Sequence, residues 1–504
     1  NTIALEGTNI TIAYVVIKDL LAVSVGENMP QKIVDVFKRE ELSLDLDNNF
    51  KDARTRYMGS HNLSGYMDVA RVISGIEELA RGKIPAEQRG EWDNVFGNFK
   101  GIRYLGFSSK VGDISNLNYS FVLDKNEMPP EIARQYSCPA DENRSLNLIP
   151  KDIIAYMWGN CFDAGFLWKR IKQETASAKQ KDEGKKAKGV EDFESALGID
   201  VEKELIPSLG NELGGYLGDI DNTGLFPIPQ LVIFIEVENQ TVIEGLLTKF
   251  TQNPMFVLQK EEYSGSTLNY VSIPISQSLK PSYAFVGKYL LIAVNNDSIK
   301  ASIDVLNKKS ESLLSNVGFK EIDRGLSGSN HYLFYADTGL LLDKARKTME
   351  WGNALADGKD KERQAFADGT KQKLEELSEE ILTAKNSLEA FQKEEENLKK
   401  QLDAARTQGL AEEELVVSLD QAGKNVKSKQ AEVDTLVSKR DSISASIEEY
   451  SKKAPKMTQE QRKVLMEAAV YPALDAFSGI GSLGIRSTIK DNHFDTDVYL
   501  KIKK

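Results

Sequence analysis

The length, composition and charge of the chain exclude several classes of protein. With 504 residues, the chain is long enough for about three units that each bury a core. It is 41% apolar and 28% charged with a net charge of −12, which is typical of a globular protein and argues against nucleic-acid binding, since that usually requires a basic face. The sequence contains no run of about eighteen apolar residues, so we expect no transmembrane segment in it.

The first part of the chain predicts a paired strand, a helix and a closing hairpin. Residues 15–25 are rich in β-branched side chains, which favours strands, and residues 30–39 follow the pattern of a short amphipathic helix. A strand and a second helix are expected next, ending near Leu79. Residues 104–123 alternate between apolar and polar side chains, which indicates an antiparallel hairpin with one buried face and one face in water.

The second part of the chain predicts the same elements after an additional front segment. In that segment we expect strands at residues 153–158 and 231–237 and helices at residues 162–174 and 240–250. Residues 175–189 are rich in Lys and Ala and predict a linker or an exposed helix. The elements shared with the first part are a paired strand at 283–294, a helix at 298–308, a strand-plus-helix segment ending near Lys347, and a hairpin at 482–501.

Short matches between the two parts indicate an internal repeat. Three of them share nearly the same spacing along the chain: residues 18–24 with 288–294, 50–51 with 319–320, and 66–68 with 335–337. A fourth match, between residues 99–106 and 477–484, has a much larger spacing. An insertion must therefore lie in the second copy, between Asp337 and Phe477.

The first copy has no counterpart of the front segment of the second copy. We therefore expect that sequence upstream of Asn1 is missing. The chain also begins at Asn1 rather than at Met and shows no signal-peptide pattern. We expect it to be a processed chain or a fragment of its gene product.

The insertion predicts two long helices. Apolar residues recur at heptad spacing from Leu374 to Ala405 and again from Leu415 to Tyr450. A break at residues 407–409 separates the two series, which predicts an antiparallel coiled-coil hairpin. Three apolar residues near its tip are candidates for contact with another protein or with a second copy of this chain: Leu410, Val416 and Val417. The alternative is that the hairpin is a plain spacer.

These patterns together predict an α+β protein. We expect two related antiparallel sheets with helices on one face, plus the inserted antiparallel coiled-coil hairpin. The predicted boundaries are residues 1–125 for the first copy, 126–146 for a linker, 147–349 and 466–504 for the second copy, and 350–465 for the inserted hairpin.

No motif in the sequence predicts catalysis, a cofactor or a metal centre. Residues 479–484 read Gly-Ile-Gly-Ser-Leu-Gly, but a dinucleotide site needs this motif after a strand and before a helix, and here the expected order is helix and then strand. Asp219 and Asp221 begin like a calcium loop, yet Gln230 occupies the position of its bidentate Glu. The sequence contains three histidines: His61, His331 and His493. Their spacing along the chain does not match that of metal ligands. We expect no enzyme and no cofactor.

The two cysteines, Cys138 and Cys161, leave two interpretations open. They are either two unrelated small apolar side chains or a single disulfide. A disulfide would persist only in an oxidising compartment. No Cys-x-x-Cys pair occurs, which argues against a zinc site or a thioredoxin-type redox site.

Two segments resemble a known family. Residues 149–152 and 197–212 are similar to a family of uncharacterised bacterial proteins that carry a domain of unknown function and are mostly exported or membrane-anchored. The resemblance covers about residues 145–345, resumes at 477–504 and leaves the coiled-coil insertion outside the pattern. It implies an extracytoplasmic location, in the periplasm or at the cell surface, and it carries over no catalytic residue.

The sequence favours a non-enzymatic bacterial envelope protein with a structural or protein-binding role. The alternative is a carrier that holds a small ligand or a lipid in a cavity between sheet and helices. A large, mainly apolar pocket would favour the carrier. Filled cores and an exposed contact patch would favour the structural role.

Overall fold

The computed structural model describes most of the chain. The described residues are 2–4, 11–25, 29–59, 61–81, 92, 96–97, 99–181, 194, 198–222, 224, 226–251, 257–273, 279–408, 413–452 and 457–503. The chain forms two units. The first unit combines Asn1–Arg346 with Leu474–Lys504, and the second unit is Lys347–Ala473.

An antiparallel sheet of 13 strands organises the first unit. Its strand order is β11-β12-β13-β14-β10-β9-β8-β16-β17-β18-β6-β5-β4. The strands are β4 (Leu63–Asp68), β5 (Ile102–Lys110), β6 (Ile114–Leu123), β8 (Ala155–Gly159), β9 (Leu209–Asp221), β10 (Ile228–Val237), β11 (Leu258–Tyr263), β12 (Ser266–Val271), β13 (Ser282–Val286), β14 (Tyr289–Ala293), β16 (Tyr332–Asp337), β17 (Ile480–Lys490) and β18 (His493–Ile502).

Two small sheets and a set of helices complete the first unit. The small sheets contain β1 (Thr2–Ala4), β2 (Thr11–Ile17) and β3 (Leu20–Val25), and β7 (Asp141–Glu142) with β15 (Ser329–Asn330). The α-helices are α1 (Met29–Lys38), α2 (Asn48–Tyr57), α3 (Val69–Arg81), α5 (Pro130–Gln135), α6 (Ala164–Lys181), α8 (Gln240–Thr251), α9 (Asn296–Leu306) and α10 (Val317–Ile322). Shorter helical turns are η1 (Leu44–Leu46), η3 (Arg144–Asn147), η4 (Val201–Leu205), η5 (Ile206–Ser208) and η6 (Leu313–Ser315).

The core lies on one face of the large sheet. Side chains alternate between the two faces along a strand, so every second residue of β8, β10 and β16 points to this face. Tyr156, Phe234 and Tyr335 are among these residues, and all three are buried. They share a cluster with Ile303 of α9 and Phe319 of α10. The Phe319 ring meets the Tyr335 ring edge-on, with centroids 5.3 Å apart, which locks α10 onto the sheet.

The pairing of β18 with β6 differs from the prediction of two separate sheets. β18 belongs to the predicted second copy and β6 to the first, and the two strands pair antiparallel from His493 with Val122 to Lys501 with Ile114. Asn118 also donates a hydrogen bond to Asp497 across this pair, at 2.9 Å. An unpaired edge strand exposes a row of N–H and C=O groups, so joining two edges satisfies both. The α+β class and the antiparallel pairing are confirmed.

Matched helix caps occur in the two predicted copies. The Asp47 side chain accepts a hydrogen bond from the backbone N–H of Phe50 at the start of α2. The Asn316 side chain accepts one from the backbone N–H of Phe319 at the start of α10. A 3₁₀ turn, η1 or η6, comes directly before each cap. Both helices therefore begin in the same local conformation.

A close contact between a strand glycine and a helical segment also occurs twice. A side chain at Gly106 in β5 would collide with Tyr57 of α2. A side chain at Gly484 in β17 would collide with Leu326, just after α10. Both strands also carry a register shift near their first residues, after Ile102 and after Ile480. The elements thus follow the same order with the same local contacts, and the duplication itself stays a prediction.

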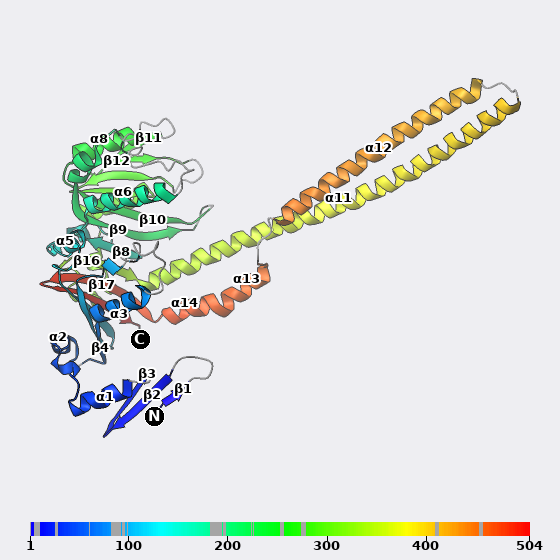
Figure 1. The fold of residues 1–504 in the computed structure, drawn as a ribbon. Helices are drawn as coiled ribbons and strands as arrows, with labels where there is room; N and C mark the ends of the chain where they lie inside the picture. Colours follow the sequence, from blue (N-terminus) through cyan, green and yellow to red (C-terminus); the bar gives the residue numbers. More distant parts are fainter. Residues whose placement is uncertain are drawn as a thin grey trace. The chain divides into compact units, whose positions relative to one another are not determined.

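The second unit is built around a helical hairpin. Its helices are α11 (Thr338–Gln408), which begins in the first unit, α12 (Glu413–Lys452), α13 (Gln459–Leu465), the π-turn η7 (Met466–Val470) and the start of α14 (Tyr471–Phe477). Figure 1 shows α11 and α12 side by side, which confirms the predicted hairpin.

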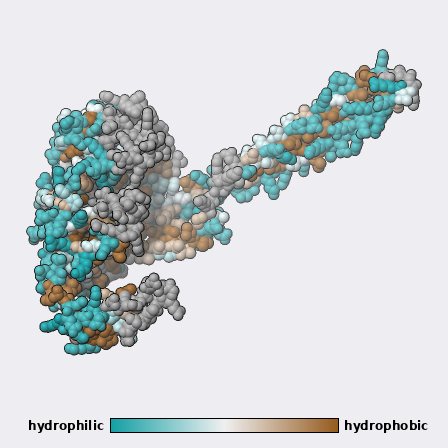
Figure 2. Space-filling view, viewed as in Figure 1, coloured by the Kyte–Doolittle hydropathy of each residue, from teal (hydrophilic) through white to brown (hydrophobic). Residues whose placement is uncertain are grey.

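The two long helices of the hairpin bury the heptad residues. Ala384 and Leu388 of α11 pack against Val433 of α12. Hydrophobic residues run between hydrophilic ones along the hairpin, as the space-filling view shows (Figure 2). Among the residues that the structure describes, no helix is both long and apolar enough to cross a membrane.

Candidate ligand-binding pocket

A cavity of about 720 Å³ lies on the large sheet and is the candidate functional site. Its floor comes from β8, β9, β10 and β16, which are neighbours in the sheet. One row of paired residues crosses this floor: Ile233, Gly215, Met157 and Phe334. These residues alternate along their strands with the core residues, so the pocket opens on the face opposite α9 and α10.

Glycine makes the floor of the pocket hollow. Gly215 stands in the middle of the row, between Ile233 and Met157. A Cβ atom at this position would lie 2.7 Å from the carbonyl oxygen of Val232, closer than packed atoms allow. A side chain here would therefore both strain β9 and fill the cavity. The neighbouring Met157 and Ile233 side chains are 52% and 46% exposed, so two large apolar groups face open space.

The lining of the pocket carries no formal charge. Among the described residues that line it, none is Asp, Glu, Lys or Arg. The polar side chains are Gln135, His331 and several tyrosines, and the rest are aliphatic, aromatic or sulfur-containing side chains or glycine. A free carboxylate or phosphate bound here would lack a cationic partner, which makes an anionic ligand group costly to bury. The arrangement suits an uncharged, apolar ligand.

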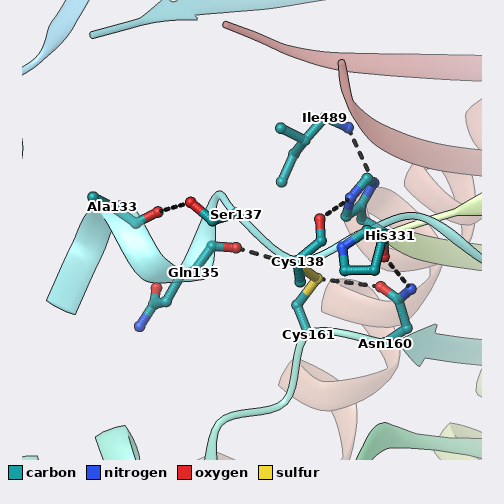
Figure 3. The surroundings of a disulfide bond; sticks show 9 residues. Ala133, Gln135, Ser137, Cys138, Asn160, Cys161, His331 and Ile489 are labelled. Atoms are coloured by element: carbon teal, nitrogen blue, oxygen red, sulfur yellow. Dashed lines mark hydrogen bonds between the residues drawn. A yellow bond between two sulfur atoms is a disulfide. The ribbon is translucent and has the colours of Figure 1, made fainter. Parts of the chain in front are cut away.

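A disulfide forms part of the rim of the pocket. Cys138 follows α5 and Cys161 follows β8, and the two are bonded with their Cα atoms 6.0 Å apart (Figure 3). Cys161 lines the pocket, as do Gln135 and Tyr136 on the other side of the bond. The disulfide therefore ties residues of α5 and of the segment after it to the sheet beside the cavity. Residues 126–146, expected as a linker, contain α5 and β7.

His331 braces this rim in its neutral form. Its Nδ1 atom accepts a hydrogen bond from the backbone N–H of Ile489 at 3.0 Å, and its Nε2 atom lies 2.9 Å from the carbonyl oxygen of Cys138. Because Nδ1 accepts a hydrogen bond, Nε2 carries the proton and donates a hydrogen bond to the carbonyl oxygen of Cys138. Burial lowers the pKa of His331 and outweighs the opposing effect of the hydrogen bond to Cys138. Figure 3 shows the ring between these two partners.

Cys138, Cys161 and His331 have the composition of a metal site, and their geometry does not support one. The three candidate ligand atoms lie within 4.8 Å of one another. A metal needs thiolates, however, and the two sulfur atoms are bonded to each other. Both ring nitrogens of His331 are also engaged with backbone groups. The cluster is therefore a structural brace.

Two buried glutamates and a lysine form a charged cluster that sequence reasoning missed. Glu212 of β9 is 1% exposed and accepts hydrogen bonds from the Trp158 indole at 3.0 Å and from the Tyr289 hydroxyl at 2.7 Å. The Lys288 ammonium lies 2.5 Å from Glu212 and 2.6 Å from Glu236. The only sequence signal was Glu236, the single charge within the apolar run at 231–237.

The charged cluster is a structural ion triad. Burial by itself would lower the pKa of Lys288, but the hydrogen bonds and charges of Glu212 and Glu236 outweigh it and raise this pKa. Burial and the hydrogen bond to Glu212 likewise raise the pKa of the Tyr289 hydroxyl. Lys288 therefore keeps its charge and Tyr289 keeps its proton. Neither Lys288 nor Tyr289 is therefore poised to exchange a proton near neutral pH.

The structure brings Cys138 and Cys161 together but does not gather the other described residues singled out in the sequence into one site. Val416 and Val417 are exposed near the start of α12, whereas Leu410 lies outside the described residues. The glycine motif at 479–484 follows α14 and enters β17, the order that a dinucleotide site does not have. Asp219, which began the calcium-like motif, pairs with Lys344 at 2.5 Å. Within the described part of the first unit, the pocket lining includes neither Asp219 nor the glycine motif.

Comparison with known proteins gives one finding. A family model described as a protein of unknown function (DUF3352) matches residues 227–449. The resemblance to an uncharacterised family is thereby confirmed. The matched range runs from β10 through most of α12, so it includes the hairpin that was expected to lie outside the family pattern. No curated protein and no solved structure matches the chain.

Proposed function

We propose that this protein binds an uncharged apolar ligand, without catalysis, in the pocket formed by β8, β9, β10 and β16. The observation that carries the proposal is the cavity of about 720 Å³ with its uncharged, mainly apolar lining. Small-molecule sites typically have volumes of about 300–1,000 Å³ and apolar walls with few polar groups. A purely structural sheet would have a filled or flat face here, whereas Gly215 keeps this one hollow.

The class of ligand follows from the lining. The alkyl chain of a neutral lipid, an isoprenoid or an uncharged aromatic compound would cover Met157, Ile233 and Phe334 and need no counter-ion. A free fatty acid would need a cation for its carboxylate, and the lining supplies none among the described residues. Gln135 lines the pocket at its rim, and its side-chain amide offers hydrogen bonds to a neutral polar end.

The proposed location is extracytoplasmic, in the periplasm or at the cell surface. The disulfide between Cys138 and Cys161 supports it, because such bonds persist in oxidising compartments and are reduced in the cytosol. Protein isolated under alkylating conditions from its native source should therefore contain no alkylated cysteine. Full alkylation of both thiols in that material would contradict this location.

A pair of tryptophan variants tests the pocket. Ile233 and Ile292 are partners on β10 and β14 with almost equal exposure, 46% and 47%, but only Ile233 lines the pocket. Ile233→Trp should fill the cavity and weaken binding of the uncharged dye Nile red by about tenfold or more. Ile292→Trp adds the same ring one strand away and should leave the affinity unchanged.

The dye titration has clear outcomes. Equal affinities of the parent and the Ile233→Trp variant, both folded by circular dichroism, would refute ligand binding in this pocket. Binding of oleate as tight as that of Nile red would refute the restriction to uncharged ligands, because the lining offers no cation for the carboxylate.

The exposed valines near the hairpin tip favour a second role. Val416 and Val417 remain exposed although the heptad residues around Val433 are buried. We infer that the tip contacts another protein or a second copy of this chain. Replacing Leu410, Val416 and Val417 with serine should lower the mass of the assembly in light scattering or abolish pull-down of a partner. Leu382→Ser, at an exposed position elsewhere on α11, is the matched control and should change neither.

Two results would contradict the hypothesis that the hairpin tip binds a partner. If the triple variant associates as the parent does, or if the parent is a strict monomer with no partner in its native extract, the hairpin is only a spacer.

A further inference from the structure

Two strands of the first predicted copy have an open edge. β4 is the last strand of the large sheet, and β3 is the last strand of its three-stranded sheet. β4 pairs with β5 and β3 pairs with β2, and within the described residues neither strand has a partner on its other side. An open edge exposes unpaired backbone groups and is a ready site for a further strand.

The equivalent strands of the second copy have both edges occupied. By the sequence matches, β4 corresponds to β16 and β3 corresponds to β14. β16 pairs with β8, from Tyr332 with Gly159 to Ala336 with Ala155. β14 pairs with β10, from Ala293 with Val232 to Tyr289 with Glu236. Three consecutive strands, β10, β9 and β8, thus connect β14 to β16.

The open strands carry apolar side chains that are buried in their counterparts. Met67 of β4 is 41% exposed, whereas the matching Ala336 of β16 is 3% exposed. Leu21 of β3 is 61% exposed, whereas the matching Leu291 of β14 is 1% exposed. Leu63 of β4 is exposed as well. Exposed apolar groups on an open edge promote aggregation unless another element covers them.

We infer that β3 and β4 bind a segment that supplies three further antiparallel strands, equivalent to β10, β9 and β8. This segment precedes β1 in the complete polypeptide, because β8, β9 and β10 precede β13 and β14 in the second copy. Its strand next to β4 carries apolar side chains toward Met67, and its strand next to β3 carries them toward Leu21. The segment resembles residues 149–237, which supply the strands that pair with β14 and β16.

Hydrogen exchange tests this inference on the complete gene product and on residues 1–504 side by side. The backbone amides of β4 should exchange about 100-fold more slowly in the complete product, since the added strand protects them. The amides of β16, which already lie between two strands, should exchange at the same rate in both proteins and serve as the internal control.

A photo-crosslinker at Met67 identifies the segment that pairs with β4. The expected product is a crosslink within one polypeptide, to a position before β1. A crosslink between two copies of the chain or to a different protein would overturn the inference. Equal exchange of β4 in the two proteins would overturn it too, as would a complete gene product that has no such segment.

Discussion

Removing the Glu212 carboxylate should destabilise the first unit more than removing any exposed carboxylate. The Glu212→Leu substitution keeps a side chain of similar size at a position that is 1% exposed, but it takes away the acceptor for three donors. Two of these donors, the Trp158 indole and the Tyr289 hydroxyl, lie in the buried core. Lys288 is the third donor, and it retains Glu236 at 2.6 Å.

The size of the effect follows from these partners. A buried donor left without an acceptor costs about 1–3 kcal/mol, and Trp158 and Tyr289 are two such donors. The partly exposed Lys288 adds little, because Glu236 still neutralises it. We expect a loss of about 3–5 kcal/mol in the free energy of unfolding, similar to other broken buried ion pairs. For a unit of this size, the thermal midpoint should fall by roughly 4–6 °C.

Tryptophan fluorescence during thermal unfolding measures this loss, since Trp158 is fully buried beside the mutated carboxylate. Glu311→Leu is the control. It removes an ion pair of similar length, 2.7 Å to Lys151, in which the Glu311 side chain is 64% exposed, and its midpoint should equal that of the parent. The reasoning is refuted if the Glu212→Leu midpoint falls no further than that of the control.

Two further predictions concern the rim of the pocket. Replacing Cys138 and Cys161 together with alanine should lower the free energy of unfolding by about 3 kcal/mol, the chain-entropy value for a disulfide that spans 23 residues; an unchanged denaturant midpoint would contradict it. His331 has a lowered pKa in the folded state, so the unfolded state binds its proton first and stability should fall as the pH drops below about 6.5. His331→Gln should show a smaller loss of thermal midpoint between about pH 7 and pH 5 than the parent, and an equal loss would contradict the assignment.

Local sequence patterns predicted most elements of the fold because they report on one segment at a time. The heptads of the insertion predicted α11 and α12, whose apolar residues pair in the seam. The alternation at 104–123 and 482–501 predicted the β5–β6 and β17–β18 hairpins. The sequence did not predict β9, since its glycines at 210, 214, 215 and 218 weaken strand propensity.

Interactions between distant segments could not be predicted in the same way. The pairing of β18 with β6 joins residues that are far apart in the chain, such as Asn118 and Asp497 with a separation of 379 positions, and no local pattern specifies which edges meet. The ion triad could not be predicted either, because Glu212, Glu236 and Lys288 come from three separate segments. The sequence left the pairing of Cys138 with Cys161 open, since spacing alone cannot show whether two cysteines meet.

The apolar run at 231–237 indicates a second apolar surface on β10 in addition to the one buried in the core. An antiparallel strand with one wet face should alternate apolar and polar residues, whereas this run is apolar on both faces. One face is explained, because Val232 and Phe234 are buried in the core with α9 and α10. The other face holds Leu231 and Ile233, which line the pocket. An exposed apolar second face is unfavourable in water, which supports the proposal that an apolar ligand covers it.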